Sequence, residues 1–279
     1  MNLHDLIGDD IKNLRPMPAS VVRLASLVQN PESSIDDIAE VVKYDPVLAA
    51  NVLRWANSAL WGGAQQVAEI KDGLIRLGPS RVLAMSVGGE VKQGLSQSFQ
   101  PYGLSESELW RHSLAAGLAV EEIHQTSPKE VPQEAFTAAL LHDIGKVIVH
   151  RYLDATRCNE MSVLIQDGKK TFFDAELQVL ETTHAEIGAQ IAEYWEFPGT
   201  LSDAIRYHHT EPETPTTLMD VVYLANLVAK FIGEGLGLEA MNMTAQGAVM
   251  QRLELSGKNL ELICSHVAGR LPEIIELYQ

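Results

Sequence analysis

The spacing of apolar residues constrains this chain more than any other feature, because it follows the period of an α-helix almost from end to end. Val21, Leu24, Leu27 and Val28, for example, recur at the spacing that places side chains on one face of a helix. No sustained alternation of apolar and polar residues indicates β-strands. A strand-like piece such as Val147–His150 is too short to alter the outcome. The sequence therefore predicts an all-α fold.

Capping residues and glycine or proline mark where the helices begin and end. Ser34 with Asp37 three residues later is a variant of the capping box, and Asp45 before Pro46 is typical of a helix start. Gly78-Pro79 separates two further helices. Beyond the helices that Ser34 and Asp45 begin, the predicted helices are Ile70–Leu77, Ser80–Val91, Glu106–His124, Glu134–Val149, Asp174–Thr183, Ala185–Trp195, Thr200–His208, Thr217–Gly233 and Asn259–Ala268.

One stretch of the chain, Gly94–Ser105, has little periodicity and contains Pro101 and Gly103. A chain of 279 residues suits one large domain or two lobes at roughly 150 residues per domain. We therefore expect a helical N-terminal lobe over residues 1–100 and a second helical lobe over residues 101–279.

The charge of the chain argues against two classes of partner. It has 21 basic and 37 acidic residues, a net charge of −16, and its richest basic cluster is only Lys169-Lys170. Such a surface repels the phosphates of nucleic acids and anionic lipid headgroups, so we expect neither direct nucleic-acid binding nor membrane binding. Cys158 and Cys264 cannot form a disulfide framework, and the N-terminus does not have the pattern of a secretion signal. A cytoplasmic location is the expectation.

Histidines carry the chemical information in the second lobe. His142 precedes Asp143, which offers an imidazole nitrogen and a carboxylate oxygen from adjacent positions, a donor mixture that suits Zn, Mn or Fe. Gly145 allows a facing helix to approach closely. Neighbouring side chains on a helix diverge by about 100°, so the pair serves one metal from the edge of a cleft, or two adjacent metals. The alternative is that these histidines are ordinary structural residues. The candidate ligands are His112, His142, Asp143, His184 and His208.

Lys146 lies close to the His-Asp pair, where it can contact a phosphate as a point charge; a solvated lysine is the simpler alternative. No nucleophile-elbow motif surrounds any serine, and no phosphate-binding glycine loop is present. These absences argue against a serine hydrolase and a Walker-type nucleotide enzyme.

Together, several motifs resemble the HDOD domain family, a branch of the HD superfamily of metal-dependent phosphohydrolases. The similarity runs from about Leu14 to about Phe231. The motifs that carry it, in chain order, are Leu14-Arg15-Pro16-Met17-Pro18, Asp45-Pro46-Val47-Leu48, residues 52–59, Ile75-Arg76-Leu77-Gly78, Leu109-Trp110-Arg111-His112-Ser113, residues 140–146, His184-Ala185-Glu186-Ile187-Gly188, Trp195-Glu196-Phe197-Pro198 and Tyr207-His208-His209.

The resemblance implies a helical N-terminal lobe packed on an HD-like helical lobe. Many HDOD proteins have lost their metal ligands and serve as regulatory modules, whereas this chain keeps the histidine pattern of the HD-GYP phosphodiesterases, a related branch. By that resemblance the metal ligands are His112, His142, Asp143, His184, His208 and His209, and the metal is one or two transition ions, with iron favoured and Mn or Zn as alternatives. Asp143 and Lys146 are the catalytic candidates in an enzyme.

One residue departs from the HD-GYP pattern. Asn226 stands where these domains carry an aspartate, and the GYP segment is absent. Losing one carboxylate leaves metal charge less well compensated, so we expect weak or no hydrolysis. The leading hypothesis is a bacterial signalling HDOD module with a retained metal site that acts through protein contacts. The alternative is a metal-dependent phosphohydrolase acting on a nucleotide or cyclic dinucleotide; a nucleotide ligand is compatible with either.

Overall fold

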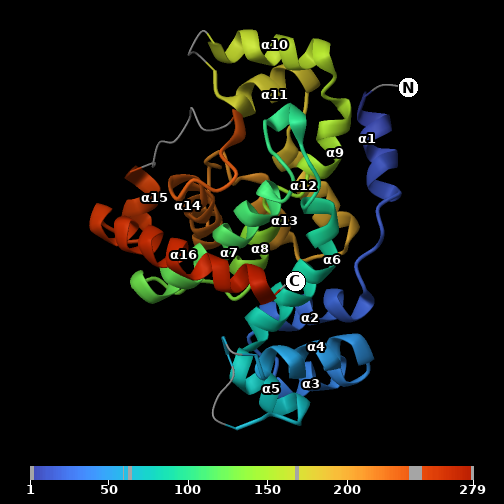
Figure 1. Ribbon diagram of the computed structural model, residues 1–279, viewed down its shortest axis with the longest axis vertical. Helices are drawn as coiled ribbons and strands as arrows, with labels where there is room; N and C mark the ends of the chain where they lie inside the picture. Colours follow the sequence, from blue (N-terminus) through green and yellow to red (C-terminus); the bar gives the residue numbers. More distant parts are fainter. Residues whose placement is uncertain (1–2, 59, 62–64, 167–169, 239–246, 278–279) are drawn as a thin grey trace.

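The computed structural model describes residues 3–58, 60–61, 65–166, 170–238 and 247–277, and in these ranges every regular element is a helix (Figure 1). The single pairing of extended backbone in this part of the chain is an isolated bridge between Phe99 and Leu104. The all-α prediction is therefore confirmed. None of the described helices combines the length and apolar character that a membrane crossing needs.

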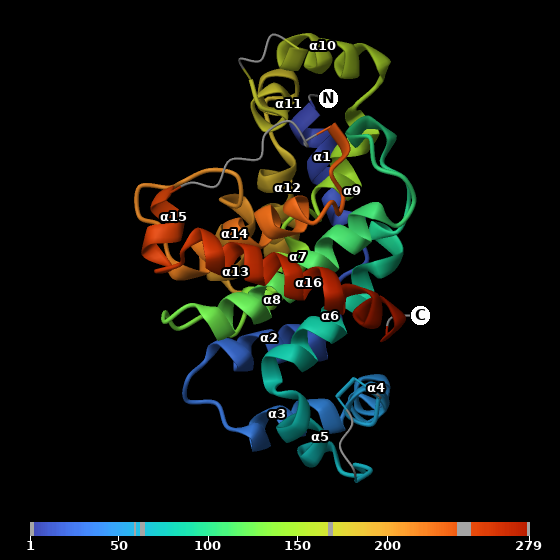
Figure 2. The same cartoon turned by 60° about the vertical axis from the view of Figure 1, so that its left-hand side comes forward.

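A group of short helices forms one end of the molecule, drawn in blue and teal at the bottom of Figures 1 and 2. Its interior is closed by Leu48, Trp55 and Leu77, which are all buried. The expected caps are present: the side chain of Ser34 accepts from the backbone of Asp37, and the next helix has proline in its first turn. The helices of this end are α2 (Ala19–Gln29), α3 (Ile35–Lys43), α4 (Pro46–Ala56), α5 (Ile70–Leu77) and the start of α6 (Pro79–Leu95).

The helix that precedes this group, α1 (Leu3–Lys12), runs along the opposite part of the molecule. It packs against α9 (Lys146–Val149) and α12 (His184–Tyr194), which belong to the second half of the chain. Ile7 and Ile11 provide its buried contacts. The first helix is thus closer to the histidine-bearing region than to the helices that follow it.

A bundle of long helices occupies the centre. Helix α7 packs extensively against α14, α16 and α8, as Figure 2 shows. Helix α7 is buried along most of its length, and its buried residues are mostly small or apolar, with His112 and Glu122 as the titratable exceptions. The central helices are α7 (Glu108–Thr126), α8 (Ala135–Leu141), α13 (Gly199–Arg206), α14 (Thr217–Phe231) and α16 (Gly257–Leu277).

The remaining elements cover the top and side of the bundle. A turn of 3-10 helix, η1 (Gln100–Tyr102), leads into α7, and a second, η2 (His150–Tyr152), follows α9. Helices α10 (Ala155–Gln166) and α11 (Phe172–Leu180) pack on each other at the top of Figure 1, and α15 (Gly247–Arg252) precedes α16.

One local prediction was wrong, because the helix expected over Glu134–Val149 is interrupted by a turn at residues 142–145. The strand-like piece Val147–His150 is helical, being part of α9 and η2, and so leaves the all-α prediction intact. Its β-branched residues are buried on all sides, so they reflect a core position rather than a strand. Helix α10 was not predicted because Met161 is its only fully buried residue, which leaves almost no apolar stripe in the sequence.

Candidate metal centre

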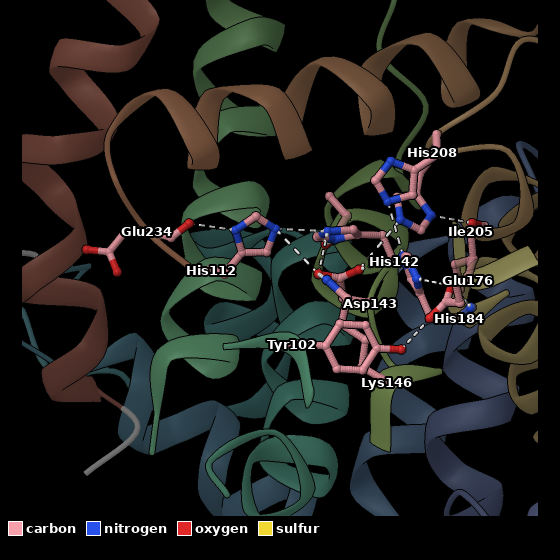
Figure 3. A network of polar contacts seen from close by, with 12 residues as sticks. Tyr102, His112, His142, Asp143, Lys146, Glu176, His184, Ile205, His208 and Glu234 are labelled. Carbon is pink, nitrogen blue, oxygen red and sulfur yellow. Dashed lines mark hydrogen bonds and ion pairs between the residues drawn. The ribbon is translucent and has the colours of Figure 1, made fainter. Parts of the chain in front are cut away.

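A tight turn between α8 and α9 carries the His-Asp pair. In residues 142–145 the backbone stays near helical angles, and bonds such as Ile144 N–H to the carbonyl of Leu141 join residues three apart. His142 and Asp143, which are adjacent in this turn, both lie at the centre of the second lobe, where histidines from other helices meet them (Figure 3).

Gly145 closes this turn against the first residue of α12. A Cβ atom on Gly145 would lie 2.0 Å from the carbonyl oxygen of His184 and 2.7 Å from the backbone nitrogen of Gly188. Only a residue without a side chain permits that approach. The expectation that Gly145 lets a facing helix come close is confirmed, and the effect is to bring His184 up to Asp143.

One oxygen of Asp143 faces two histidines from different helices. Its Oδ2 atom is 3.6 Å from Nε2 of His112 on α7 and 3.4 Å from Nε2 of His142. The two ring nitrogens are themselves 3.1 Å apart. Oδ2 also accepts a hydrogen bond from Nζ of Lys146 at 2.8 Å.

The other oxygen of Asp143 faces a second pair. Its Oδ1 atom is 3.3 Å from Nε2 of His184 and 3.6 Å from Nε2 of His208, which follows α13. His209 completes this group, with its Nε2 atom 3.1 Å from that of His184. Two groups of donor atoms thus share one carboxylate, and in each group the atoms lie within 4.8 Å of one another. The structure brings together all six residues that the sequence nominated as ligands.

The opposite ring nitrogens of four histidines are all engaged. Nδ1 of His112 is 2.9 Å from the carbonyl oxygen of Glu234, and Nδ1 of His142 and of His208 are each 2.6 Å from the carbonyl oxygens of Ala139 and Ile205. Carbonyl oxygens only accept, so these nitrogens carry the protons.

His184 is held differently. Its Nδ1 atom is 2.7 Å from Oε2 of Glu176, a carboxylate rather than a backbone carbonyl. With Nδ1 protonated in all four rings, the Nε2 atoms present lone pairs to Asp143.

Lone pairs facing one another without donors between them are the mark of a cation site. Nε2 of His208 and Oδ1 of Asp143 are buried and have no hydrogen-bond partner. Burial lowers the pKa of both His112 and His208 to about 3, which keeps the rings neutral and able to ligate. A mixture of neutral imidazoles and one carboxylate fits a first-row transition ion.

Lys146 places an ammonium group beside Asp143. Burial alone would raise the pKa of the Asp143 carboxyl, but the Lys146 ammonium holds that pKa well below its usual range. The ammonium also lies over the ring of Tyr102, 5.2 Å from its centroid. Asp143 is therefore ionised, with Oδ2 partly neutralised and Oδ1 exposed to the His184 group.

A buried carboxylate that the sequence analysis did not single out lies behind His184. Glu176 on α11 is fully buried and accepts from the Tyr102 hydroxyl at 2.5 Å (Figure 3). The sequence holds a signal for it: Glu176 is four residues after Phe172 and four before Leu180, both buried, so a charged residue stands in the apolar stripe of its helix.

The loop that follows α14 supports the other side of the site. Glu234 offers its carbonyl to His112 while its carboxylate pairs with Arg111. Gly235 has a φ of +60°, and a Cβ on it would lie 2.6 Å from the Cβ of His112. The loop therefore packs directly on the ligand histidine.

The remaining histidines and carboxylates of interest lie elsewhere. Glu108, one turn before His112, accepts from the backbone of Ser105 and is outside both donor groups among the described residues. His266 pairs with Glu122 on α7, and His150 bonds the carbonyl of Lys146. The side chain of His4 lies outside the described residues.

Asn226 is buried on α14, which packs against α7, α8 and α13. Its Oδ1 atom has no hydrogen-bond partner. Lys230, one turn further along α14, is also buried, and its charge acts on His112.

The sequence pattern that defines the HDOD domain family matches residues 14–211, and this span contains both donor groups. The chain belongs to the HDOD domain family. An uncharacterized protein of Treponema pallidum (strain Nichols) is 26% identical over 242 residues, covering 81% of this chain. The chain spans only 44% of the length of that relative.

Solved structures share the HDOD fold along the whole chain. An HDOD domain protein of unknown function from Geobacter sulfurreducens has a TM-score of 0.69 at 24% identity, covering 99% of this chain and 95% of its own. A protein from Marinobacter aquaeolei VT8 that is provisionally assigned to signal transduction has a TM-score of 0.73 at 24% identity, and the match covers 100% of this chain and 61% of that protein. A protein from Shewanella amazonensis SB2B that is provisionally assigned as a metal-dependent phosphohydrolase has a TM-score of 0.55 at 17% identity, and the match covers 100% of this chain and 99% of that protein.

Proposed function

We propose that this HDOD protein is a signalling module with a working metal site, and that the bound ion sets the state it presents to protein partners. One observation carries the proposal: lone pairs on the imidazoles of two donor groups converge on the ionised carboxylate of Asp143, and among the described residues Lys146 is its hydrogen-bond donor. Such an arrangement is unfavourable unless a cation lies among the lone pairs.

The first ion belongs with the group that contains His184, His208 and His209. Oδ1 of Asp143 faces this group and lacks a hydrogen bond, whereas Oδ2 already accepts from Lys146. Three imidazoles and one carboxylate oxygen suit iron, with Mn or Zn as alternatives. A second ion would use His112 and His142, where it competes with the positive charge of Lys146.

Burial favours a regulatory role. The side chains of His112, His142, Asp143, His184 and His208 are each 2% exposed or less. An ion fits among them, but in this conformation a phosphate ester has no access to them. The structural relative from Marinobacter, provisionally assigned to signal transduction, agrees with this role.

A second function, metal-dependent hydrolysis of a nucleotide or cyclic dinucleotide, is favoured by the shared Asp143 and by Lys146. Two bound ions would activate a water molecule and polarise phosphoryl oxygens. Lys146, at 2.8 Å from Asp143, would then neutralise charge on the phosphoryl group. The provisional assignment of the Shewanella relative points the same way.

Elemental analysis of protein purified without chelators, combined with a turnover assay, separates the two functions. One ion per chain and no hydrolysis of cyclic-di-GMP or bis(p-nitrophenyl) phosphate are expected for the regulatory module. Two ions and turnover that His142→Ala abolishes would establish the enzyme instead. Protein that neither carries nor takes up an ion would contradict both.

A further inference from the structure

Glu176 differs from the groups that hold Nδ1 of the three other ligand histidines whose Nδ1 contacts are described. His112, His142 and His208 donate from Nδ1 to neutral backbone carbonyls. His184 donates instead to a carboxylate, Oε2 of Glu176, at 2.7 Å. The Nε2 atoms of all four rings face the same aspartate, so the rings differ in the group that accepts from Nδ1.

Hydrogen-bond donors surround both oxygens of Glu176. Oε2 accepts a second hydrogen bond from the backbone nitrogen of His184 at 2.8 Å, at the positive end of α12. Oε1 accepts from the hydroxyl of Tyr102 at 2.5 Å. All three contacts come from donors, which an ionised carboxylate can accept together. Among the described residues no lysine or arginine forms an ion pair with Glu176.

We propose that Glu176, fixed by Tyr102, is a positioning residue that makes His184 the anchoring ligand of the metal centre. This inference rests on the proposed metal site. A carboxylate behind an imidazole fixes its tautomer and orientation and raises the basicity of the opposite nitrogen. His184 thus binds the ion through Nε2 more strongly than a ring that is backed by a carbonyl, and the first ion enters on its side of Asp143.

Glu176→Gln removes the charge and keeps the shape. The amide oxygen can accept from His184, and the amide NH2 can donate to Tyr102, so the fold retains its hydrogen bonds. Tyr102→Phe removes only the hydroxyl and keeps the ring beneath Lys146. The two variants therefore separate charge from packing.

Glu122 provides the matched control. It is another buried glutamate that faces a histidine, with Oε2 at 2.9 Å from Nδ1 of His266, and it also accepts from Arg270. It lies outside both donor groups. Glu122→Gln should lower thermal stability and leave metal binding unchanged.

The experiment is a titration with Co2+, followed by its visible absorption, with thermal unfolding of each metal-free protein. Glu176→Gln should bind Co2+ about 10- to 100-fold more weakly than wild type, as removal of such supporting groups commonly does. Tyr102→Phe should show a smaller loss in the same direction. The Nδ1 proton resonance of His184 in metal-free protein should move upfield in Glu176→Gln, because a neutral acceptor replaces an anion.

The possible failures point to different errors. Co2+ affinity that is unchanged in Glu176→Gln, with a loss of thermal stability like that of Glu122→Gln, would show that Glu176 is only structural. A His184 proton resonance that does not move would contradict the charged hydrogen bond, whether or not metal binds. Wild type that binds no Co2+ would overturn the proposed function itself.

Discussion

Gly145 and His184 pack so tightly that no side chain fits between them. The Cβ of an alanine at position 145 would lie 2.0 Å from the carbonyl oxygen of His184. The backbone of α12 would have to move away from the turn that carries Asp143. The distance between His184 and Asp143 therefore depends on one missing methyl group.

Gly145→Ala is expected to weaken metal binding at least tenfold and to cost about 1–3 kcal/mol of stability through overpacking. Gly89→Ala is the control, because Gly89 is an exposed position inside α6 where a Cβ meets nothing within 4 Å. That change should be neutral or stabilising by about 0.5–1 kcal/mol. Metal titration and thermal unfolding of both variants test this, and equal behaviour of the two would refute the packing argument.

The ion pair of Asp143 and Lys146 makes a second prediction. Asp143→Ala removes the carboxylate that accepts from the buried Lys146 ammonium, which should cost about 3–5 kcal/mol as well as metal binding. Adding Lys146→Met should restore much of the stability and none of the metal binding, because an apolar pair of similar volume replaces a buried ion pair. Chemical denaturation of the single and double variants measures the coupling. A double variant no more stable than Asp143→Ala would contradict it.

Asn226 stands where the resemblance to HD-GYP domains implies an aspartate, which makes Asn226→Asp a test of that resemblance. Asn226→Asp should lower the stability of metal-free protein by a few kcal/mol, since its buried Oδ1 has no hydrogen-bond partner. With metal the same change should raise occupancy and uncover hydrolysis of cyclic-di-GMP. Thermal unfolding with and without metal, and a turnover assay, give the result. Robust turnover by wild type would instead show that Asn226 is not the limiting defect.

The loop after α14 offers a test confined to His112. Gly235→Ala places a Cβ 2.6 Å from the Cβ of His112, so it should impair an ion held by His112 and His142 and spare one held by His184. Gly233→Ala is the control: its φ of +88° imposes similar backbone strain, but a Cβ there meets nothing within 4 Å. Ion stoichiometry and the Co2+ spectrum distinguish the two. An equal loss of bound metal in both variants would show that backbone strain, rather than contact with His112, causes the effect.

Helical periodicity and capping residues were enough to predict the all-α fold and most of its helices, because both act within a few residues of one another. The six nominated ligands followed from motif resemblance, and their meeting around Asp143 depended on packing that no local pattern reports. The turn at residues 142–145 was missed for that reason. Glu176 was overlooked although its position in the apolar stripe of α11 marked it.

The supports of the ligand histidines also bear on how the site withstands mutation. Carbonyl oxygens of Glu234, Ala139 and Ile205 hold three of the rings, and every amino acid supplies a carbonyl. Substitutions at those three positions leave the acceptor in place as long as the backbone keeps its path. His184 lacks a backbone acceptor of this kind, because its Nδ1 donates to the side chain of Glu176. Side-chain substitutions at positions 139, 205 and 234 therefore leave the Nδ1 acceptors of three ligands intact, whereas a substitution at position 176 removes the acceptor of the fourth.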